Sequence, residues 1–165
     1  ETVLENRKSL MADAILVEDE TGEFVSAGVP ELGTVTEIEV AERTVSGVVS
    51  KLVIHGSEHT ISISGQSNIR AILNPVNQEI VRQDGSTVTG WTSLPSPYYY
   101  VEKTDAGFVV HGGGFGHGAG MSIYGAGVLD RQGKSYKYIL RHYFSYVDFA
   151  SIYTMDDGEE TADSE

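Results

Sequence analysis

Residues 112–127 read GGGFGHGAGMSIYGAG, and half of these sixteen positions are glycine. Each glycine inside a regular helix or strand costs roughly 1 kcal/mol relative to alanine. The segment therefore predicts an irregular backbone that uses positive φ angles, lets a ligand approach closely, or turns successive amides toward an oxygen. Any fold for this chain has to be built around this loop.

Alternating polar and apolar residues before the loop predict antiparallel strands. Residues 35–44, 48–54 and 59–63 have this pattern, with turn residues at 46–47 and 56–57. Such short turns favour three consecutive strands in a meander. Two further strands are expected on either side of a turn formed by Asp105, Ala106 and Gly107, at 98–102 and 108–111.

Short helices are expected between and after these strands. One carries Ile69, Ile72 and Leu73, with Ser64 or Ser67 as its candidate N-cap. The others cover 121–129 and 135–143 after the loop, and the first thirteen residues also contain helix formers. Residues 76–97 hold several Gly and Pro residues and predict a long connection. The expected fold is α+β, mainly antiparallel β as a meander or partial barrel, with a few short helices following the Gly-rich loop.

Charge and composition narrow the functional classes. The 165 residues carry a net charge of −13, which makes binding to a phosphate backbone a poor hypothesis. Because the chain has no Cys, disulfides and thiolate chemistry are excluded. Acidic residues crowd the last ten positions, so residues 154–165 are expected to form a disordered acidic tail. We expect residues 1–32 to be a segment cut from a larger domain, and 33–153 to form the main region.

Common motifs do not explain the loop. The G-x-G-x-x-G spacing of dinucleotide-binding loops is absent, and Val128 stands where the first Gly of a Walker A loop would be. Ser122 has Gly120 two residues before it but Tyr124 two residues after it, so it does not fit a hydrolase nucleophile elbow.

Histidines and aromatic residues near the loop leave several hypotheses open. His111 and His117 could hold a transition metal with a carboxylate, although no H-E-x-x-H motif is present. Alternatively, His117 hydrogen-bonds to loop backbone, or it lies in a cleft and binds or polarises a substrate. Trp91 and the tyrosines offer faces on which sugars could stack, but aromatic residues at such spacing are more often part of a core. They are Tyr98, Tyr99, Tyr100, Tyr124, Tyr136, Tyr138 and Tyr143.

The sequence from the loop onward resembles the end of the stage II sporulation protein D (SpoIID/LytB) domain of bacterial cell-wall enzymes. The family's GHGxGMSQxGA loop and GKSYxxIL helix match residues 116–126 and 133–140. Upstream, residues 67–73, SNIRAIL, are similar to the family's I-R-x-x-L helix, and 33–56 are similar to its paired strands. The resemblance runs from Gly33 to Tyr153, with Ile123 in place of the usual Gln and Val48 in place of a frequent Arg.

The resemblance implies a peptidoglycan lytic transglycosylase, which cleaves glycan strands with one carboxylic acid and needs no metal or cofactor. The family's segment that carries the general-acid Glu has no match in these residues, so the catalytic Glu is expected upstream and none within the chain. The implied substrate-binding residues are Gly116, His117, Gly118, Gly120, Ser122 and Tyr124.

The same resemblance implies partners and a location. The partners are peptidoglycan glycan strands and other cell-wall remodelling proteins, without nucleic acid. The location is extracytoplasmic, with secretion or membrane anchoring through a region outside this chain. Two alternatives remain, a non-catalytic peptidoglycan-binding or scaffold module and a metal-dependent hydrolase that uses His111 and His117.

Overall fold

Antiparallel pairing of short strands dominates the computed structural model, which describes residues 14–28 and 30–150. The chain divides into two units, residues 1–118 and 119–165. All of the described strands lie in the first unit, together with one helix, and two helices lie in the second. The predicted α+β class with mainly antiparallel strands and short helices is confirmed.

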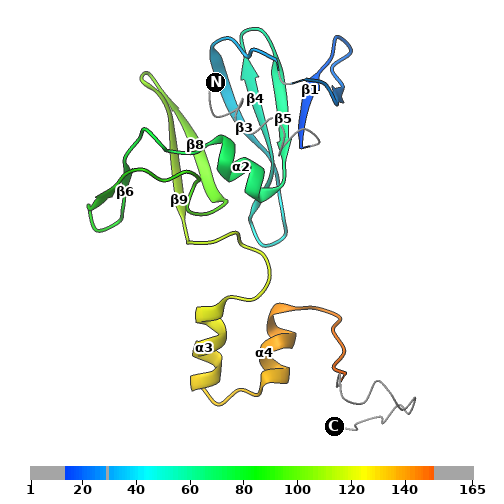
Figure 1. Ribbon diagram of the computed structural model, residues 1–165, viewed down its shortest axis with the longest axis vertical. Helices are drawn as coiled ribbons and strands as arrows, with labels where there is room; N and C mark the ends of the chain where they lie inside the picture. The colour runs from blue at the N-terminus through cyan, green and yellow to red at the C-terminus, as the bar shows by residue number, and fades with distance from the viewer. Residues whose placement is uncertain (1–13, 29, 151–165) are drawn as a thin grey trace. The chain divides into compact units, whose positions relative to one another are not determined.

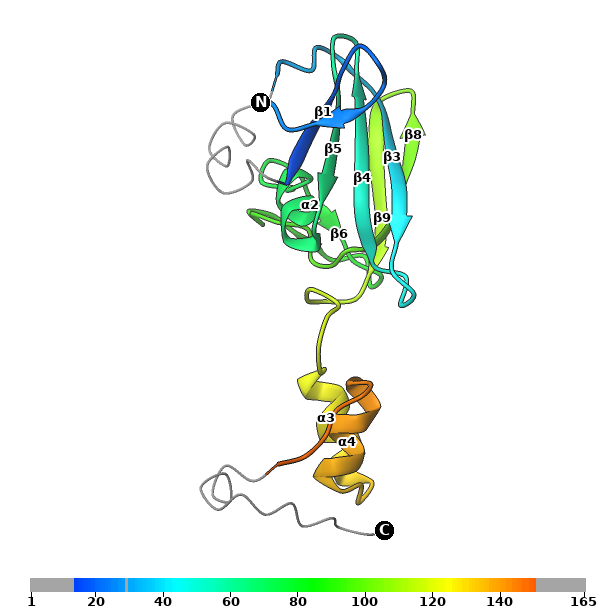
Figure 2. The ribbon, with the colours of Figure 1, turned by 90° about the vertical axis from the view of Figure 1, so that its right-hand side faces the viewer.

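The largest sheet has five strands in the order β2-β1-β5-β4-β3 (Figures 1 and 2). They are β1 (Ile15–Glu18), β2 (Phe24–Val25), β3 (Val35–Arg43), β4 (Val49–Gly56) and β5 (Thr60–Ser64). Consecutive antiparallel pairing of β3, β4 and β5 confirms the predicted meander. The turn after β3 is closed by a hydrogen bond of 2.9 Å from the Gly47 amide to the Thr44 carbonyl, with Gly47 at φ 85°.

Strands β1 and β2 were not predicted. Ile15 and Val17 lie opposite Ile63 and Ile61 of β5, and both side chains are buried. This places part of the segment 1–32 in the same sheet as the meander. The domain boundaries expected from the sequence stay predictions. The helix formers of the first thirteen residues and the acidic tail expected at 154–165 lie outside the described residues.

Helix α2 (Gln66–Ile72) follows β5 and lies against β4 and β5. The expectation of Ser64 or Ser67 as its N-cap is wrong, because Gly65 holds that position without a side-chain cap. Ser64 still belongs to β5, and Gly65 turns the chain with φ 85°. The helix therefore begins through a backbone conformation that favours glycine.

The segment expected to be an irregular connection contains a small hairpin. Strand β6 (Ile80–Val81) pairs with β7 (Thr87–Val88). The Arg82 amide donates to the Ser86 carbonyl at 2.8 Å, and Asp84 accepts hydrogen bonds from the amide and hydroxyl of Ser86. The pKa of Asp84 is lowered by these Ser86 bonds and by the nearby Arg82 charge.

A second hairpin, β8 (Tyr98–Thr104) with β9 (Gly107–Gly113), confirms the predicted strand pair. It is held to the large sheet by two hydrogen bonds. Arg43 Nη2 donates to the Tyr99 carbonyl at 2.6 Å, and the Val49 amide donates to the Pro97 carbonyl at 3.0 Å. The buried core joins sheet, helix and hairpin; it comprises Ile15, Val17, Val49, Leu52, Ile54, Ile61, Ile63, Ile69, Leu94 and Tyr99.

The second unit contains α3 (Ile123–Arg131) and α4 (Tyr136–Tyr143), near the predicted positions. Ser122 and Ser135 cap these helices by accepting hydrogen bonds from the amides of Gly125 and Tyr138. A Cβ at Gly125 would collide with the Tyr143 hydroxyl, so glycine allows α4 to approach α3.

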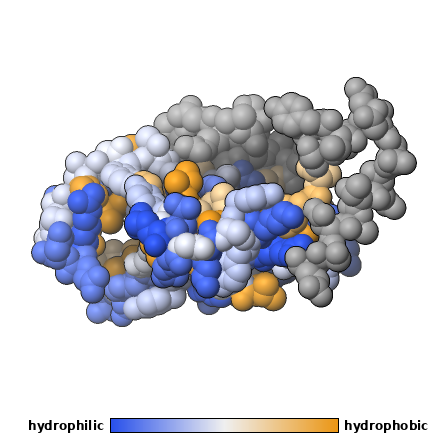
Figure 3. Space-filling view, turned by 90° about the horizontal axis from the view of Figure 1, so that it is seen from below, coloured by the Kyte–Doolittle hydropathy of each residue, from blue (hydrophilic) through white to orange (hydrophobic). Residues whose placement is uncertain are grey.

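Apolar side chains also reach the surface, where Figure 3 shows them in orange among hydrophilic residues. In the second unit neither helix contains a buried residue. The exposed large apolar residues of that unit are Met121, Ile123, Tyr124, Val128, Tyr136, Tyr138, Phe144 and Tyr146. Among the described residues no helix has the length and apolar character needed to cross a bilayer.

Leu52→Ala tests the assignment of the core. Leu52 is 0% exposed, so its truncation removes apolar contacts and leaves a cavity. We expect the free energy of unfolding in urea to fall by about 2–5 kcal/mol. The matched control is Val45→Ala in the exposed turn after β3. An equal effect of the two substitutions would contradict the assigned core.

Candidate functional site

The Gly-rich segment begins inside β9, where glycine is required by close packing. Gly112 lies opposite Tyr99 in the hairpin. A Cβ built on Gly112 would lie 2.8 Å from the Tyr98 carbonyl oxygen and 3.1 Å from Tyr99 Cβ. The absence of a side chain therefore allows the two strands to meet at the end of the hairpin.

After β9 the backbone enters the left-handed region at every second residue. Gly114, Gly116, Gly118 and Gly120 have φ angles of 81°, 117°, 75° and 73°. Residues with side chains rarely adopt such angles, which explains the alternating glycines of the motif. A Cβ on Gly118 would also lie 2.7 Å from Val48 Cγ2 and 3.1 Å from Tyr98 Cε2. Gly118 is thus required for close approach as well as for its backbone angle.

A carbonyl clamp fixes the start of this loop. Arg70 of α2 donates from Nε to the Leu94 carbonyl at 2.7 Å and from Nη2 to the Pro95 carbonyl at 3.3 Å. The Gly116 amide donates to the same Pro95 carbonyl at 2.9 Å. The Arg of the SNIRAIL segment therefore has a positioning role, because it holds the segment against which the loop is anchored.

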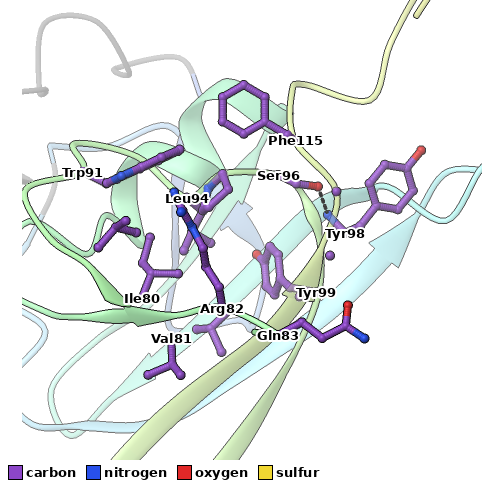
Figure 4. A pocket seen from close by; sticks show the side chains of 16 residues that line it. Ile80, Val81, Arg82, Gln83, Trp91, Leu94, Ser96, Tyr98, Tyr99 and Phe115 are labelled. Carbon is purple, nitrogen blue, oxygen red and sulfur yellow. Dashed lines mark hydrogen bonds between the residues drawn. The ribbon is translucent and has the colours of Figure 1, made fainter. Parts of the chain in front are cut away.

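A pocket of about 420 Å³ opens beside the clamp, within the first unit (Figure 4). Its walls are formed by the β6–β7 hairpin, the segment from Trp91 to Ser96, the β8–β9 hairpin and residues 112–115 at the start of the Gly-rich loop. Its lining residues are Ile80, Val81, Arg82, Gln83, Val88, Trp91, Leu94, Pro95, Ser96, Tyr98, Tyr99, Val110, Gly112, Gly113, Gly114 and Phe115.

Aromatic rings form one side of this pocket. Trp91 and Phe115 meet edge to face with 5.7 Å between ring centroids, and the Phe115 side chain is 83% exposed. In Figure 4 the Arg82 side chain extends toward Trp91 from the opposite side of the pocket. The pocket thus combines exposed aromatic surface with one cationic group, an arrangement suited to a ligand that has both apolar faces and an acid.

Tyr99 lies between the core and the pocket. Its side chain is only 5% exposed, and its hydroxyl has no hydrogen-bond partner among the described residues. Burial raises the pKa of this phenol well above its ordinary value, so the group stays protonated at physiological pH.

A shallower cavity on the same hairpin involves His111. It is lined by Arg43, Tyr98, Tyr99, Tyr100, His111, Gly112 and Gly113. His111 Nε2 lies 2.8 Å from Glu102 Oε2, and its ring stacks on Tyr100 at 4.8 Å. Within residues 14–28 and 30–150, no group of three or more His, Asp or Glu side chains is placed to hold a metal ion. The metal hypothesis thus receives no third ligand from this part of the chain.

The substrate-binding residues predicted from the sequence fall in both units. Gly116, His117 and Gly118 end the first unit, where the Gly116 amide is engaged by Pro95 and the His117 side chain lies at the surface. The second unit contains the other three. Gly120 precedes α3, Ser122 is its N-cap, and Tyr124 is 89% exposed. The six residues stay a predicted set.

No sequence pattern predicts the pocket itself. Trp91 is a candidate stacking residue, but no pattern pairs it with Phe115 or places Arg82 beside it. The available signal was the Asp84–Gly85 turn, which predicts a hairpin when short β-rich runs such as Ile80–Val81 and Thr87–Val88 flank it. That hairpin brings Arg82 to the pocket.

Comparison with known proteins shows the family. The profile of a family described as a domain of unknown function (DUF8618) matches residues 16–120, so the chain belongs to this family. An uncharacterized protein of Brachyspira hyodysenteriae is 32% identical over 98 residues, which are 58% of this chain and 27% of that protein. No solved structure matches the chain significantly.

Two shorter similarities involve proteins with descriptive names. The amidase enhancer of Bacillus subtilis is 41% identical over 58 residues, which are 35% of this chain and 8% of that protein. Stage II sporulation protein D of Bacillus amyloliquefaciens is 54% identical over 37 residues, or 22% of this chain and 11% of that protein. These partial matches indicate a SpoIID-related region, and this chain aligns with about a quarter or less of each of the relatives.

Arg70→Met tests the carbonyl clamp. Loss of the guanidinium removes the hydrogen bonds to Leu94 and Pro95, and we expect a loss of about 1–3 kcal/mol in unfolding free energy. Hydrogen exchange at the Gly116 amide should accelerate as well, because its acceptor is no longer fixed. Lys103→Met, at an exposed position of β8, is the matched control. Unchanged exchange at Gly116 would show that Arg70 does not position the loop.

Gly118→Ala and Gly114→Ala separate backbone strain from close contact. Both residues have left-handed φ angles, but a Cβ on Gly114 meets its nearest atom, Ser96 Oγ, only at 3.4 Å. We expect Gly114→Ala to lower stability by about 1 kcal/mol. Gly118→Ala should cost about 1–3 kcal/mol more, because its Cβ overlaps Val48. Equal losses in thermal or urea unfolding would refute the contact at Gly118.

Proposed function

We propose that this member of the DUF8618 family is a glycan-binding part of a bacterial cell-wall remodelling protein of the SpoIID/LytB type. Its ligand is the glycan strand of peptidoglycan. The names of two partial relatives, an amidase enhancer and a stage II sporulation protein, support this assignment. The Gly-rich loop supports it through its agreement with the SpoIID motif.

One observation carries the proposal most directly. The start of the Gly-rich loop, Gly113 to Phe115, forms a wall of the same pocket as Trp91 and Tyr98. Glycan recognition commonly joins an aromatic surface, on which the apolar face of a sugar can rest, to hydrogen-bonding groups that orient its hydroxyls. The loop motif and an aromatic pocket thus meet in one place in the first unit.

The proposed chemistry of the longer protein is lytic cleavage of the strand. A general acid protonates the leaving glycosidic oxygen, and the same group then accepts a proton from a hydroxyl of the sugar as an anhydro ring closes. Such an acid needs a pKa raised toward neutrality. No Asp or Glu lines the pocket in the first unit, so the proposal assigns the acid to a Glu outside these 165 residues.

In this proposal the acid comes from another part of the protein, and this chain binds and orients the strand. The proposed contacts outside the pocket are the motif residues Gly116, His117, Gly118, Gly120, Ser122 and Tyr124. In this proposal the loop backbone and the surface-exposed side chain of His117 contact oxygens of the sugars. Because peptidoglycan lies outside the cytoplasm, the proposal also places the protein there, together with other cell-wall remodelling proteins.

A second candidate function is a wall-binding module without catalytic activity. No carboxylate is among the residues that line the pocket. This observation fits a binding module without catalysis as well as it fits an enzyme whose acid comes from another part of the protein. The two differ in one product. Lytic cleavage by the longer protein yields anhydro-disaccharides, which mass spectrometry detects, whereas a binding module yields none.

His117→Ala tests the glycan-binding role of the loop. We expect the variant to remain folded, with a cooperative thermal transition, but to lose at least about tenfold in affinity for purified glycan strands, because a hydrogen bond to a ligand oxygen is lost. Sedimentation of the chain with insoluble peptidoglycan measures this. His55→Ala, on β4 beside Glu39, provides a control with the same substitution in the first unit. Full binding by the His117 variant would contradict the proposed role of the loop.

A further inference from the structure

The pocket of the first unit has a charge pattern that the proposed function does not by itself explain. Arg82 is the only charged residue among the 16 that line it. The neighbouring acid in sequence, Asp84, is turned into the β6–β7 loop, where Ser86 donates to it from its amide at 2.9 Å and from its hydroxyl at 2.6 Å. Asp84 is not a lining residue. A cation therefore lines the pocket of a chain whose net charge is −13.

We propose that this pocket is a subsite for an acidic N-acetylated sugar, with Arg82 bound to the sugar's carboxylate and Trp91 and Phe115 against its apolar surface. The proposal rests on the proposed function, which supplies the glycan strand as ligand. In glycan strands of peptidoglycan that have lost their peptides, the sugar with these properties is N-acetylmuramic acid, whose lactyl group then ends in a free carboxyl group. The subsite therefore binds one of the two alternating sugars of the strand selectively.

Charge favours an acid as the occupant. A guanidinium presents paired N–H donors in the plane that a carboxylate accepts, and such charge-assisted hydrogen bonds are stronger than those between neutral groups. No lining side chain competes for Arg82 as an acceptor of opposite charge. A cationic ligand would meet Arg82 as a like charge, and a neutral sugar would offer it no charge-assisted hydrogen bond inside the pocket. Asp84, whose pKa the Arg82 charge lowers, lies outside the pocket lining.

Size and shape favour a sugar as the carrier of that acid. A volume of about 420 Å³ lies within the range of small-molecule sites, roughly 300–1,000 Å³. Trp91 and Phe115 meet at a right angle, with an interplanar angle of 87°, so they form a corner and not a flat platform. Such a corner can hold an acetamido methyl group or one face of a pyranose ring. Gln83 adds a neutral hydrogen-bonding group.

The chain carries its own reporter for this pocket. Trp91 is the single tryptophan of the 165 residues, and it lines the pocket. Any change in intrinsic tryptophan fluorescence on addition of a saccharide therefore reports on this place. Arg82→Gln keeps the reporter and removes the positive charge, and Lys103→Gln removes the same charge from β8 outside the pocket.

The test is a fluorescence titration of the whole chain and both variants with the disaccharide of N-acetylglucosamine and N-acetylmuramic acid. The comparison ligands are the same disaccharide with its carboxyl group converted to an amide, and N,N′-diacetylchitobiose. We expect saturable binding of the acidic disaccharide. Its affinity should fall at least about tenfold in Arg82→Gln, through loss of a charge-assisted hydrogen bond, and remain unchanged in Lys103→Gln. The two neutral ligands should bind the parent chain at least about tenfold more weakly than the acid.

Three results would overturn the proposal. If the fluorescence of Trp91 does not change while the chain still sediments with peptidoglycan, the subsite is refuted and the proposed function is left in place. Equal affinities for the acidic and neutral ligands would refute the role of Arg82. If the fluorescence of Trp91 does not change and the chain also fails to sediment with peptidoglycan, the subsite and the proposed function are both refuted. Circular dichroism of Arg82→Gln should match that of the parent chain, so that a loss of binding reports on the ligand and not on folding.

Discussion

The Pro95 carbonyl oxygen is the point on which the arrangement of the site depends. It accepts hydrogen bonds from the Gly116 amide and from Arg70 Nη2, so one atom joins the Gly-rich loop to helix α2. The next residue, Ser96, contributes through its side chain, because its hydroxyl oxygen accepts a hydrogen bond from the Tyr98 amide at 3.0 Å. The segment 94–98 is thereby fixed at both ends. Leu94, Pro95, Ser96 and Tyr98 of this segment line the pocket together with the aromatic pair and the β8–β9 hairpin.

Glycine at alternate positions lets the loop leave this anchor without strain. A chain with ordinary residues at 114, 116 and 118 would pay a conformational cost at each left-handed angle, and at 118 it would also collide with Val48. The glycines thus serve the backbone first. This explains why phosphate-binding and nucleophile-elbow motifs fail to match, since those motifs place their glycines to serve other geometries.

Sequence patterns predicted the parts of the fold that depend on local periodicity. The meander, the β8–β9 hairpin and helices α2, α3 and α4 were expected from alternation and from turn residues. Strand β1 was missed because its four residues, ILVE, are too short to show a period, and only pairing with β5 stabilises them. The N-cap of α2 was assigned to a serine because propensity favours serine, whereas the turn out of β5 requires a positive φ angle.

The pocket was harder to predict for a similar reason. Its walls come from segments that lie apart in the sequence, such as Arg82, Trp91 and Phe115, and only the fold brings them together. The sequence motif directed attention to residues 116–124, which follow the pocket wall along the chain. A motif of this kind shows where the backbone conformation restricts the residue type. It does not show which side chains other segments of the chain contribute to a site.

In the proposed function, a glycan strand binds where the Gly-rich loop meets the aromatic pocket. The most direct measurement is the change in amide and indole NMR shifts when soluble glycan strands, freed of peptides, are added to the chain. Binding at this place should cause the largest changes at the Trp91 indole and at residues 112–116, with little change in β1 and β2. Changes confined to the five-stranded sheet, or no changes at saturating strand concentration, would contradict it.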